Sequence, residues 1–354
     1  MLEDVQKIYQ VLQDDISRKI FTAQLGFSAT GDVRFIRELP MKYRNLSADI
    51  VLLDKKINEH GNARLVIFGA GDNGVDIAKG YRDCGFFCFV DNYKQEKKEP
   101  VTGLPIYSFF EYKEKFGLEN TMFLVAVHRE DFVREICSQL TGHGVPRENI
   151  LHVADWRNNS SQYFDVFVPQ EHEMFVDCGC YDGSTAFRFA GWCAERGAVY
   201  DKIWCFEPDE TSYERCSRIL RSLDNCCLYQ YGVADQNGDV FFMANGRETA
   251  RIMETGEDTA AIQKIEVKCL DDFLKNERVT FIKMDIEGEE YKALEGARNL
   301  IKEQKPRLAI SVYHRRDDIV RIPQLILSLN SDYRFYLRHY SMLANEIVLY
   351  AECR

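Results

Sequence analysis

Hydrophobic positions at the start of the chain repeat with the spacing of one helical face, and further along they gather in short runs. The helical spacing joins Leu2, Val5, Ile8, Leu12, Ile16 and Ile20, and later Ile50, Leu53 and Ile57. We therefore predict a helical N-terminal segment over residues 1–60. From residue 61 onward, short hydrophobic runs alternate with helical patterns, which is typical of β-α-β units and a parallel sheet.

The first group of hydrophobic runs predicts strands at residues 64–68, 86–90, 122–127 and 149–153. The first strand leads into Gly69-Ala-Gly-Asp-Asn-Gly74, a G-x-G-x-x-G turn, and the second strand ends in Asp91. These elements predict a Rossmann-like accessory domain over residues 61–155. The polar stretch that follows predicts a linker over residues 156–170.

The second group predicts another α/β domain over residues 171–354. Its strands are predicted at 174–177, 202–207, 227–231, 281–285 and 308–313, with helices at 185–194, 211–223 and 289–302. The runs at 240–244 and 265–269 predict an inserted β pair, and those at 334–338 and 346–350 predict a closing hairpin. The predicted fold class is therefore α/β, with two Rossmann-like domains in tandem.

Composition narrows the class of protein. The chain has 354 residues, of which 45% are hydrophobic and 29% charged, so a two-domain globular protein is expected. It has no apolar run long enough for a membrane span and no basic, apolar leader, so we predict a cytoplasmic protein. The net charge of -11 argues against nucleic-acid binding. The twelve cysteines lack zinc-site spacing and are predicted to be reduced, and a homodimer is a possible state.

A second glycine turn follows the predicted strand at 174–177. Gly179 and Gly183 allow the backbone to reverse tightly and to approach a ligand closely, and Asp177 stands just before them. Glu207 ends the next strand, where a carboxylate can accept both hydroxyls of a ribose. These residues predict a nucleoside-type cofactor site; the alternative is that the two acids only cap the turn and the following helix.

Several motifs, which follow one another in the same order along the chain, resemble those of the FkbM family of S-adenosylmethionine-dependent methyltransferases. They are Val176-Asp-Cys-Gly-Cys-Tyr-Asp-Gly-Ser-Thr185, Phe206-Glu-Pro-Asp209, Ile282-Lys-Met-Asp-Ile-Glu-Gly-Glu-Glu290, Ile310-Ser-Val-Tyr-His314 and Tyr333-Arg-Phe-Tyr-Leu-Arg-His339. The closing hairpin is also usual in Rossmann-like methyltransferases. The resemblance implies a class I methyltransferase sheet, S-adenosyl-L-methionine as cofactor, and O-methylation of a hydroxyl on a sugar, glycan or natural product. The cofactor-binding residues expected are Asp177, Gly179, Tyr181, Gly183, Ser184, Thr185, Glu207 and Asp285.

Candidates for catalysis lie at the ends of two strands. His314 follows an apolar strand, and its ordinary pKa near 6.5 suits a base that removes the acceptor's hydroxyl proton. Asp285 and Glu287 are the other predicted catalytic residues. Together with Glu290 they could instead hold a hard divalent metal, but no metal is predicted because no further ligand can be placed. A structural role for His314 is the competing interpretation.

The first glycine turn supports a second hypothesis. The stretch from Leu65 to Val153 resembles the nucleotide-sugar-binding domain of bacterial sugar acyltransferases, which implies an accessory nucleotide or sugar site. The residues implied are Gly69, Gly71, Asn73, Gly74 and Asp91. The alternatives are an NAD(P)-dependent oxidoreductase built on this domain, or a fold that only packs, dimerises or positions the acceptor. Acceptor specificity is assigned to this domain and to the segment from Gly246 to Gln263.

Overall fold

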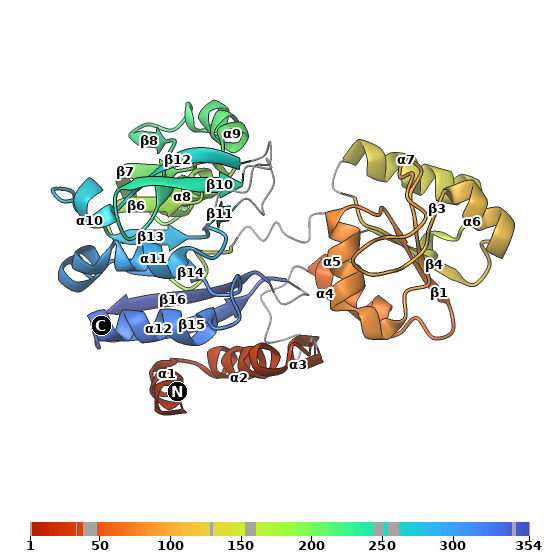
Figure 1. The fold of residues 1–354 in the computed structure, drawn as a ribbon, viewed down its shortest axis with the longest axis horizontal. Coiled ribbons are helices and arrows are strands. Elements are labelled where there is room, and N and C mark those ends of the chain that lie inside the picture. Colours follow the sequence, from red (N-terminus) through yellow and green to blue (C-terminus); the bar gives the residue numbers. More distant parts are fainter. Residues whose placement is uncertain are drawn as a thin grey trace. The chain divides into compact units, whose positions relative to one another are not determined.

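The computed structural model describes residues 2–32, 34–37, 48–127, 130–152, 161–243, 251–253, 262–341 and 345–353. They divide into two compact units (Figure 1). One unit contains residues 2–31, 161–339 and 346–353; because it holds the motifs that resemble a methyltransferase family, it is called the methyltransferase-type unit. The accessory unit contains the described residues from 32 to 152 together with 340, 341 and 345. Within the described residues, no helix combines the length and the apolarity needed to cross a membrane.

A seven-stranded sheet organises the methyltransferase-type unit, in the order β15-β16-β14-β13-β6-β7-β8. Only β16 runs antiparallel to its neighbours, so the sheet ends in the predicted hairpin. This confirms the predicted fold class. The strands are β6 (His172–Cys178), β7 (Val199–Phe206), β8 (Cys226–Tyr229), β13 (Phe281–Met284), β14 (Arg307–Ser311), β15 (Tyr333–His339) and β16 (Ile347–Cys353).

The chain winds outward from the centre of this sheet in both directions. From β6 it runs through β7 to β8, and from β13 it runs through β14 to the hairpin. Because parallel crossovers are right-handed, the connecting helices of the two halves lie on opposite faces. One half has α8 (Ser184–Glu195) and α9 (Glu210–Leu220), and the other has α11 (Glu290–Glu295), a π-helical turn (Leu300–Gln304) and α12 (Asp318–Leu329). The order therefore reverses between β6 and β13, where open α/β sheets bind ligands at the carboxyl ends of their strands.

Two of these helices differ from the prediction. The helix expected at 289–302 is divided into α11 and the π-helical turn, which Asp271 supports by accepting from the Asn299 and Leu300 amides. The sequence interpretation contained no helix at α12, although its apolar face is well marked. Pro323 lies inside α12, within its second turn.

A smaller sheet is inserted between β8 and β13, with the order β11-β10-β12-β9. Its strands are β9 (Gly232–Val233), β10 (Gly238–Met243), β11 (Arg251–Met253) and β12 (Ile262–Lys268), and a short helix, α10 (Leu270–Phe273), follows. The antiparallel pairing of β10 with β12 confirms the predicted β pair.

The N-terminal residues pack on the outer strand of the hairpin. Helices α1 (Leu2–Val11) and α2 (Asp15–Thr30) are joined at Leu12, which pairs with Phe335 of β15. Asp14 caps α2 by accepting from the Ser17 amide at 2.7 Å and forms an ion pair with Arg338 at 2.8 Å. The predicted N-terminal segment over 1–60 is thus divided, because residues 2–31 lie in the methyltransferase-type unit and the helix α4 (Ala48–Asn58) lies in the accessory unit.

The described part of the predicted linker over 156–170 packs on the domain that follows it. Residues 161–170 belong to the methyltransferase-type unit. Phe164 and Phe167 are buried against the aromatic ring of Phe281, and Tyr163 is buried beside them. The aromatic side chains of Phe164 and Phe167 thus attach residues 161–170 to the core of the domain. Residues 153–160, which include the predicted boundary at 155, lie outside the described part of the chain.

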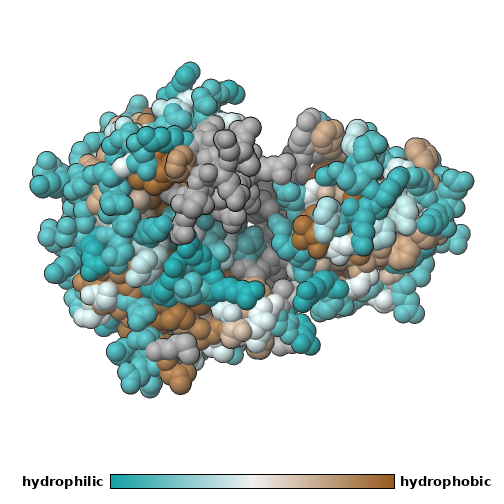
Figure 2. Space-filling view, viewed as in Figure 1, coloured by the Kyte–Doolittle hydropathy of each residue, from teal (hydrophilic) through white to brown (hydrophobic). Residues whose placement is uncertain are grey.

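The accessory unit has a five-stranded parallel sheet in the order β3-β2-β1-β4-β5, which is the strand order of a Rossmann fold. Alternating residues of β1 face two separate apolar clusters: Leu65 and Ile67 on one side, Val66 and Phe68 on the other. Its elements are α3 (Arg34–Arg37), α4 (Ala48–Asn58), β1 (Arg64–Phe68), α5 (Asp72–Gly80), β2 (Cys88–Val90), β3 (Ile106–Tyr107), α6 (Phe109–Phe116), β4 (Thr121–Val125), α7 (Glu130–Gly142) and β5 (Ile150–His152), with 3-10 turns at Arg82–Cys84 and Arg147–Asn149. Hydrophilic residues cover most of the face seen in Figure 2.

Candidate active site

The glycine turn after β6 is held very close to the end of β13. Gly179 has a φ of +76°, and a Cβ at this position would lie 2.0 Å from the backbone oxygen of Asp285. Gly183 also has a positive φ, of +82°, and starts α8. Tyr181 adopts a left-handed φ of +50°, which is uncommon for a residue with a side chain. The turn is therefore tight and packed against the end of β13, and its role in binding a ligand stays a prediction.

Glu207 stands beside this turn at the end of β7. One carboxylate oxygen accepts from the Tyr181 amide at 2.9 Å, and the other accepts from the Asp209 amide at 3.0 Å. Burial raises the pKa of Glu207 to about 7, although the two amides act in the opposite direction. Glu207 is thus hydrogen-bonded directly to the glycine turn. This contact would not be needed if Glu207 only capped the helix that follows it.

Asp177 is buried near the carboxyl end of β6 and forms an ion pair with Lys283 of β13. The ammonium nitrogen lies 3.0 Å from the Asp177 carboxylate and donates to the Gly179 carbonyl at 2.6 Å. The side chains of Lys283 and Asp177 are 3% and 0% exposed. The sequence interpretation gave Lys283 no role and expected it either to point away from the apolar layer or to pair with an acid; the ion pair with Asp177 confirms the second alternative. A lysine inside an apolar strand was the signal, because such a charge needs a partner.

The first turn of α8 contains two more predicted residues. The amide of Ser184 donates to the Asp182 carboxylate at 2.9 Å, and the Thr185 hydroxyl accepts from Arg188 at 3.3 Å. Burial raises the pKa of both Asp177 and Tyr163, and the charge of Arg188, which the sequence interpretation missed, partly opposes this rise at both groups. The residues of this turn therefore lie at the same end of the sheet as Asp177.

The loop after β13 carries the acids of the second strand end. The Asp285 amide donates to the Cys178 carbonyl at 3.1 Å, so Asp285 continues the pairing of β13 with β6. Glu287 has a left-handed φ of +58°. Glu290 is fully buried and accepts from the Ile286 amide at 2.8 Å, which closes the loop onto the start of α11. A strained residue between two acids indicates a loop shaped for a purpose other than stability alone.

His314 follows β14 and lies among these acids. Its Nδ1 is 2.9 Å from Glu290, and its Nε2 is 3.4 Å from Asp285 and 3.8 Å from Glu287. Burial lowers the pKa of His314, but Glu290, Asp285 and Glu287 raise it further, to about 10. The sequence interpretation used a pKa near 6.5, and this premise is wrong because the three carboxylates come from a loop distant in sequence. The structure thus brings together His314, Asp285 and Glu287 as predicted.

Two tyrosines that the sequence interpretation missed hold Asp285. The Tyr163 hydroxyl donates to one carboxylate oxygen at 2.6 Å, and the Tyr313 hydroxyl lies 3.3 Å from the other. Tyr163 has a φ of +77°, and its amide donates to the Tyr350 hydroxyl at 2.8 Å. Beside it, Gln162 donates to Glu346 at 2.8 Å. No sequence signal placed Tyr163 here, because it lies in the stretch interpreted as a linker.

The glycine turn of the accessory unit has a different set of contacts. Gly74 packs against Gly69, where a Cβ on Gly74 would lie 2.1 Å from the Gly69 oxygen. Asp91 accepts from the Ala70 amide at 2.9 Å, and its other oxygen accepts from the amides of Tyr93 and Lys94. Gly71 caps α5 without a side-chain bond, and Asn73 lies in the first turn of that helix. The accessory nucleotide or sugar site stays a prediction.

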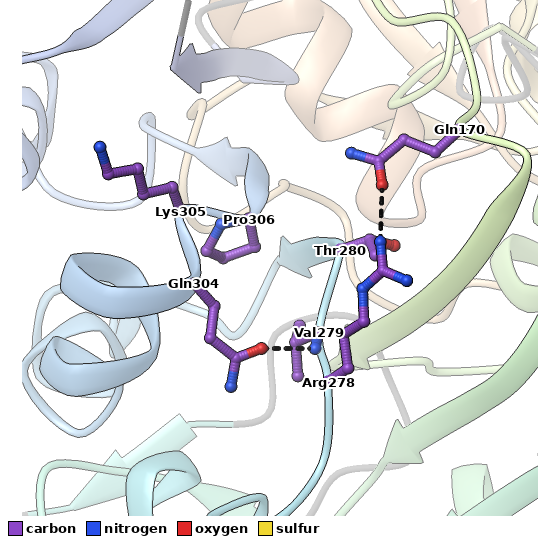
Figure 3. A pocket seen from close by; sticks show the side chains of 7 residues that line it. All are labelled: Gln170, Arg278, Val279, Thr280, Gln304, Lys305 and Pro306. Atoms are coloured by element: carbon purple, nitrogen blue, oxygen red, sulfur yellow. Dashed lines mark hydrogen bonds between the residues drawn. The ribbon is translucent and has the colours of Figure 1, made fainter.

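A cavity of about 280 Å³ lies in the methyltransferase-type unit but away from these residues (Figure 3). It borders the amino ends of β13 and β14, opposite to the end that carries Asp285. Its polar groups are bonded within the wall: Gln304 accepts from the Val279 amide at 2.8 Å, and Arg278 donates to Gln170 at 3.3 Å. The cavity is therefore separate from the candidate site. It is lined by Gln170, Arg278, Val279, Thr280, Gln304, Lys305 and Pro306.

Comparisons with known proteins agree with this geometry. Residues 177–340 match the family model described as "Methyltransferase FkbM domain". A similar curated protein is 2-O-methyltransferase NoeI from Sinorhizobium fredii (strain NBRC 101917 / NGR234), which is 26% identical over 147 residues; the match covers 36% of this chain and 58% of NoeI. The chain thus spans a little over half the length of that relative.

A solved structure is similar over almost the whole chain. It is the methyltransferase FkbM from Methylobacillus flagellatus KT, with 23% sequence identity and a TM-score of 0.51. The match covers 94% of this chain and 98% of that one, and it supports the fold. The turn after β6, the acid loop after β13 and His314 all fall within the range of the family match. Residues 177–340 are therefore a methyltransferase domain of the FkbM family, whose methyl donor is S-adenosylmethionine.

Proposed function

We propose that the protein transfers a methyl group from S-adenosylmethionine to a hydroxyl oxygen of a sugar, glycan or natural product. The observation that supports this most is the contact between the Gly179 turn and Asp285. It places a turn suited to the cofactor directly beside a group of acids and hydroxyls suited to an acceptor. Methyl transfer needs the two reactants side by side and in line, and such positioning can supply much of the acceleration.

The residues of the turn fit the cofactor. The Gly179 position leaves no room for a side chain, so the backbone itself forms the wall of the site. We assign Glu207 to the ribose hydroxyls and Asp177 to the side of the methionine ammonium. When bound, S-adenosylmethionine supplies an electrophilic methyl group. Tyr181, Gly183, Ser184 and Thr185 complete the proposed cofactor side.

Asp285 and Glu287 are the carboxylates proposed to receive the acceptor's proton. An oxygen that is being methylated becomes far more acidic, so an ordinary carboxylate is basic enough to take its proton. His314 has a carboxylate near each ring nitrogen, so neither nitrogen faces an acceptor freely. We therefore assign His314 to holding the acids in place. Tyr163 and Tyr313 fix the orientation of Asp285.

The charges around this group favour a neutral acceptor. Asp285, Glu287 and Glu290 lie within 4 Å of His314, and Glu346 lies 3.5 Å from the Tyr313 hydroxyl. Acids therefore outnumber the nearby cations, and an anionic acceptor would be repelled. Hydroxyl groups, in contrast, can donate to carboxylates. NoeI, the similar curated protein, is itself named as a 2-O-methyltransferase.

Incubation of the protein with S-adenosylmethionine and a set of neutral methyl glycosides is expected to yield S-adenosylhomocysteine and an O-methylated glycoside. The Asp285→Asn variant is expected to lower turnover by about 10²-fold or more, because general-base catalysis contributes that much. Mass spectrometry identifies the product. The matched control is Asp332→Asn, since Asp332 is exposed and pairs only loosely with Lys305 at 3.4 Å.

Binding of NAD with no binding of S-adenosylhomocysteine would refute this proposal and favour the oxidoreductase alternative. A thermal shift experiment separates the two, because a ligand at 100 times its dissociation constant adds about 2.7 kcal/mol to stability. Preferential methylation of uronic acids over neutral glycosides would contradict the proposal that the acids of the site favour a neutral acceptor, but it would not contradict methyl transfer itself.

Cofactor affinity is expected to fall as the pH drops below 7. Ribose hydroxyls donate to the ionised carboxylate of Glu207, whose pKa is about 7 in the free protein. Binding therefore favours the ionised form, and below pH 7 the carboxyl must first lose a proton. The dissociation constant of S-adenosylhomocysteine is expected to be about tenfold higher at pH 6 than at pH 8, measured by calorimetry.

The Glu207→Gln variant provides the control. It cannot ionise, so its affinity is expected to be weak and independent of pH over this range. Equal pH dependence in the variant and the unmodified protein would remove Glu207 from the ribose site. The number of protons released on binding, obtained from calorimetry in two buffers, gives a second measurement of the same group.

A further inference from the structure

Three side chains from separate elements converge on one point of the acid group. Asp285 follows β13, Glu290 begins α11, and His314 follows β14. Each offers one metal-ligating atom, and these atoms lie within 4.8 Å of one another. The sequence predicted no metal, because it could not place a ligand from a third element. His314 is that ligand, and the fold supplies it.

The excess of negative charge around His314 favours binding of a cation. Asp285, Glu287 and Glu290 all lie within 4 Å of the His314 ring, and the Glu290 and His314 side chains are 0% and 9% exposed. Even a protonated His314 carries only one positive charge against three negative ones. Lys283 forms its ion pair with Asp177, although its charge also acts on Asp285. Buried charges are normally paired or bound to a metal, because an uncompensated one costs several kcal/mol.

A second observation points to an ion rather than to hydrogen bonds. Both ring nitrogens of His314 and the Oε2 atom of Glu290 are buried without a hydrogen bond of good geometry to the described residues. Oε1 of Glu290 already accepts from the Ile286 amide at 2.8 Å, so Oε2 is the buried oxygen left to bind an ion. An imidazole binds one ion through one nitrogen, and a carboxylate beside its other nitrogen can then accept the ring N–H.

We propose that Asp285, Glu290 and His314 bind one divalent metal ion. Carboxylates suit Mn²⁺ and Mg²⁺ and imidazole suits Zn²⁺, so this mixed set favours a first-row ion such as Mn²⁺. The consequence for catalysis rests on the proposed function. An ion here would lie on the acceptor side and would increase the acidity of a hydroxyl that binds to it. Glu287, which is not one of the three ligands, is then left to take the proton.

Metal binding can be tested without an acceptor. The full chain is treated with a chelator, exchanged into buffer at pH 7.5 and titrated with MnCl₂, and the free ion is measured by electron paramagnetic resonance. One Mn²⁺ per chain is expected. Spin relaxation of bound S-adenosylhomocysteine by Mn²⁺ then tests whether the ion lies near the cofactor. No bound Mn²⁺ at millimolar concentration, and none of Mg²⁺ or Zn²⁺ by calorimetry, overturns the proposal.

Variants locate the ion. His314→Gln and Glu290→Gln are each expected to weaken Mn²⁺ binding at least tenfold, whereas Asp332→Asn leaves it unchanged. A cooperative thermal transition shows that each variant is folded. Binding that is undiminished in both ligand variants places the ion elsewhere and refutes the proposal. A chain that binds S-adenosylhomocysteine but no ion refutes only this inference, and one that binds Mn²⁺ but no S-adenosylhomocysteine supports it while refuting the proposed function.

Discussion

The Gly179→Ala variant is expected to lose cofactor binding and about 2–5 kcal/mol of unfolding free energy. A Cβ at this position would lie 2.0 Å from the Asp285 oxygen, and the φ of +76° disfavours any side chain. A left-handed non-glycine residue costs about 1–3 kcal/mol, and overpacking of a filled site costs a similar amount. The methyl group can fit only if the end of β13 moves away, which displaces Asp285 as well. Urea unfolding and calorimetry with S-adenosylhomocysteine measure the two effects.

Gly191→Ala is the matched control for that variant. Gly191 lies on the exposed side of α8 in the same domain, and a Cβ there would meet no atom within 4 Å. Alanine is favoured over glycine inside a helix by about 1 kcal/mol, so this variant is expected to be slightly more stable and to bind S-adenosylhomocysteine normally. Full cofactor affinity in Gly179→Ala would show that the turn does not need its close approach to Asp285.

The sequence predicted the two strand ends because their signals are local. Asp177 and Gly179 directly follow an apolar run, and Asp285 and Glu287 follow another. Parallel strands place their carboxyl ends at one edge of a sheet, so the pairing of β6 with β13 could be expected from the fold class alone. The same reasoning placed Glu207 next to the glycine turn, where it accepts from Tyr181.

The prediction failed where a residue's environment comes from distant parts of the chain. The polar stretch around Tyr163 resembled a linker, yet Phe164 and Phe167 fasten it to the domain core. His314 was interpreted by its ordinary pKa, because a single sequence does not show that Glu290 lies 2.9 Å away. The N-terminal helical pattern was correct as local structure. Its division between two units depends on contacts such as Asp14 with Arg338, which no local pattern contains.

The Lys283→Met variant is expected to lose about 3–5 kcal/mol of unfolding free energy. The ammonium group neutralises Asp177 at 3.0 Å and also donates to the Gly179 carbonyl. Methionine keeps much of the side-chain volume, so the main change is the loss of the charge. Asp177 is then left as a buried carboxylate without its ion-pair partner, and breaking a buried ion pair from one side costs that amount. Urea unfolding measures the loss, and calorimetry with S-adenosylhomocysteine shows whether the turn still forms.

Two further variants separate the buried charge from the loss of a lysine as such. Lys202 lies on β7 and forms an ion pair with Glu277, and both side chains are about one-third exposed. Lys202→Met is therefore expected to lower the unfolding free energy by less than about 1 kcal/mol. Adding Asp177→Asn to Lys283→Met removes the orphaned charge and is expected to recover part of the stability, although not the Gly179 contact. If the double variant is as unstable as the sum of its single changes, the two residues do not interact, and Lys283 supports the turn through its bond to Gly179 alone.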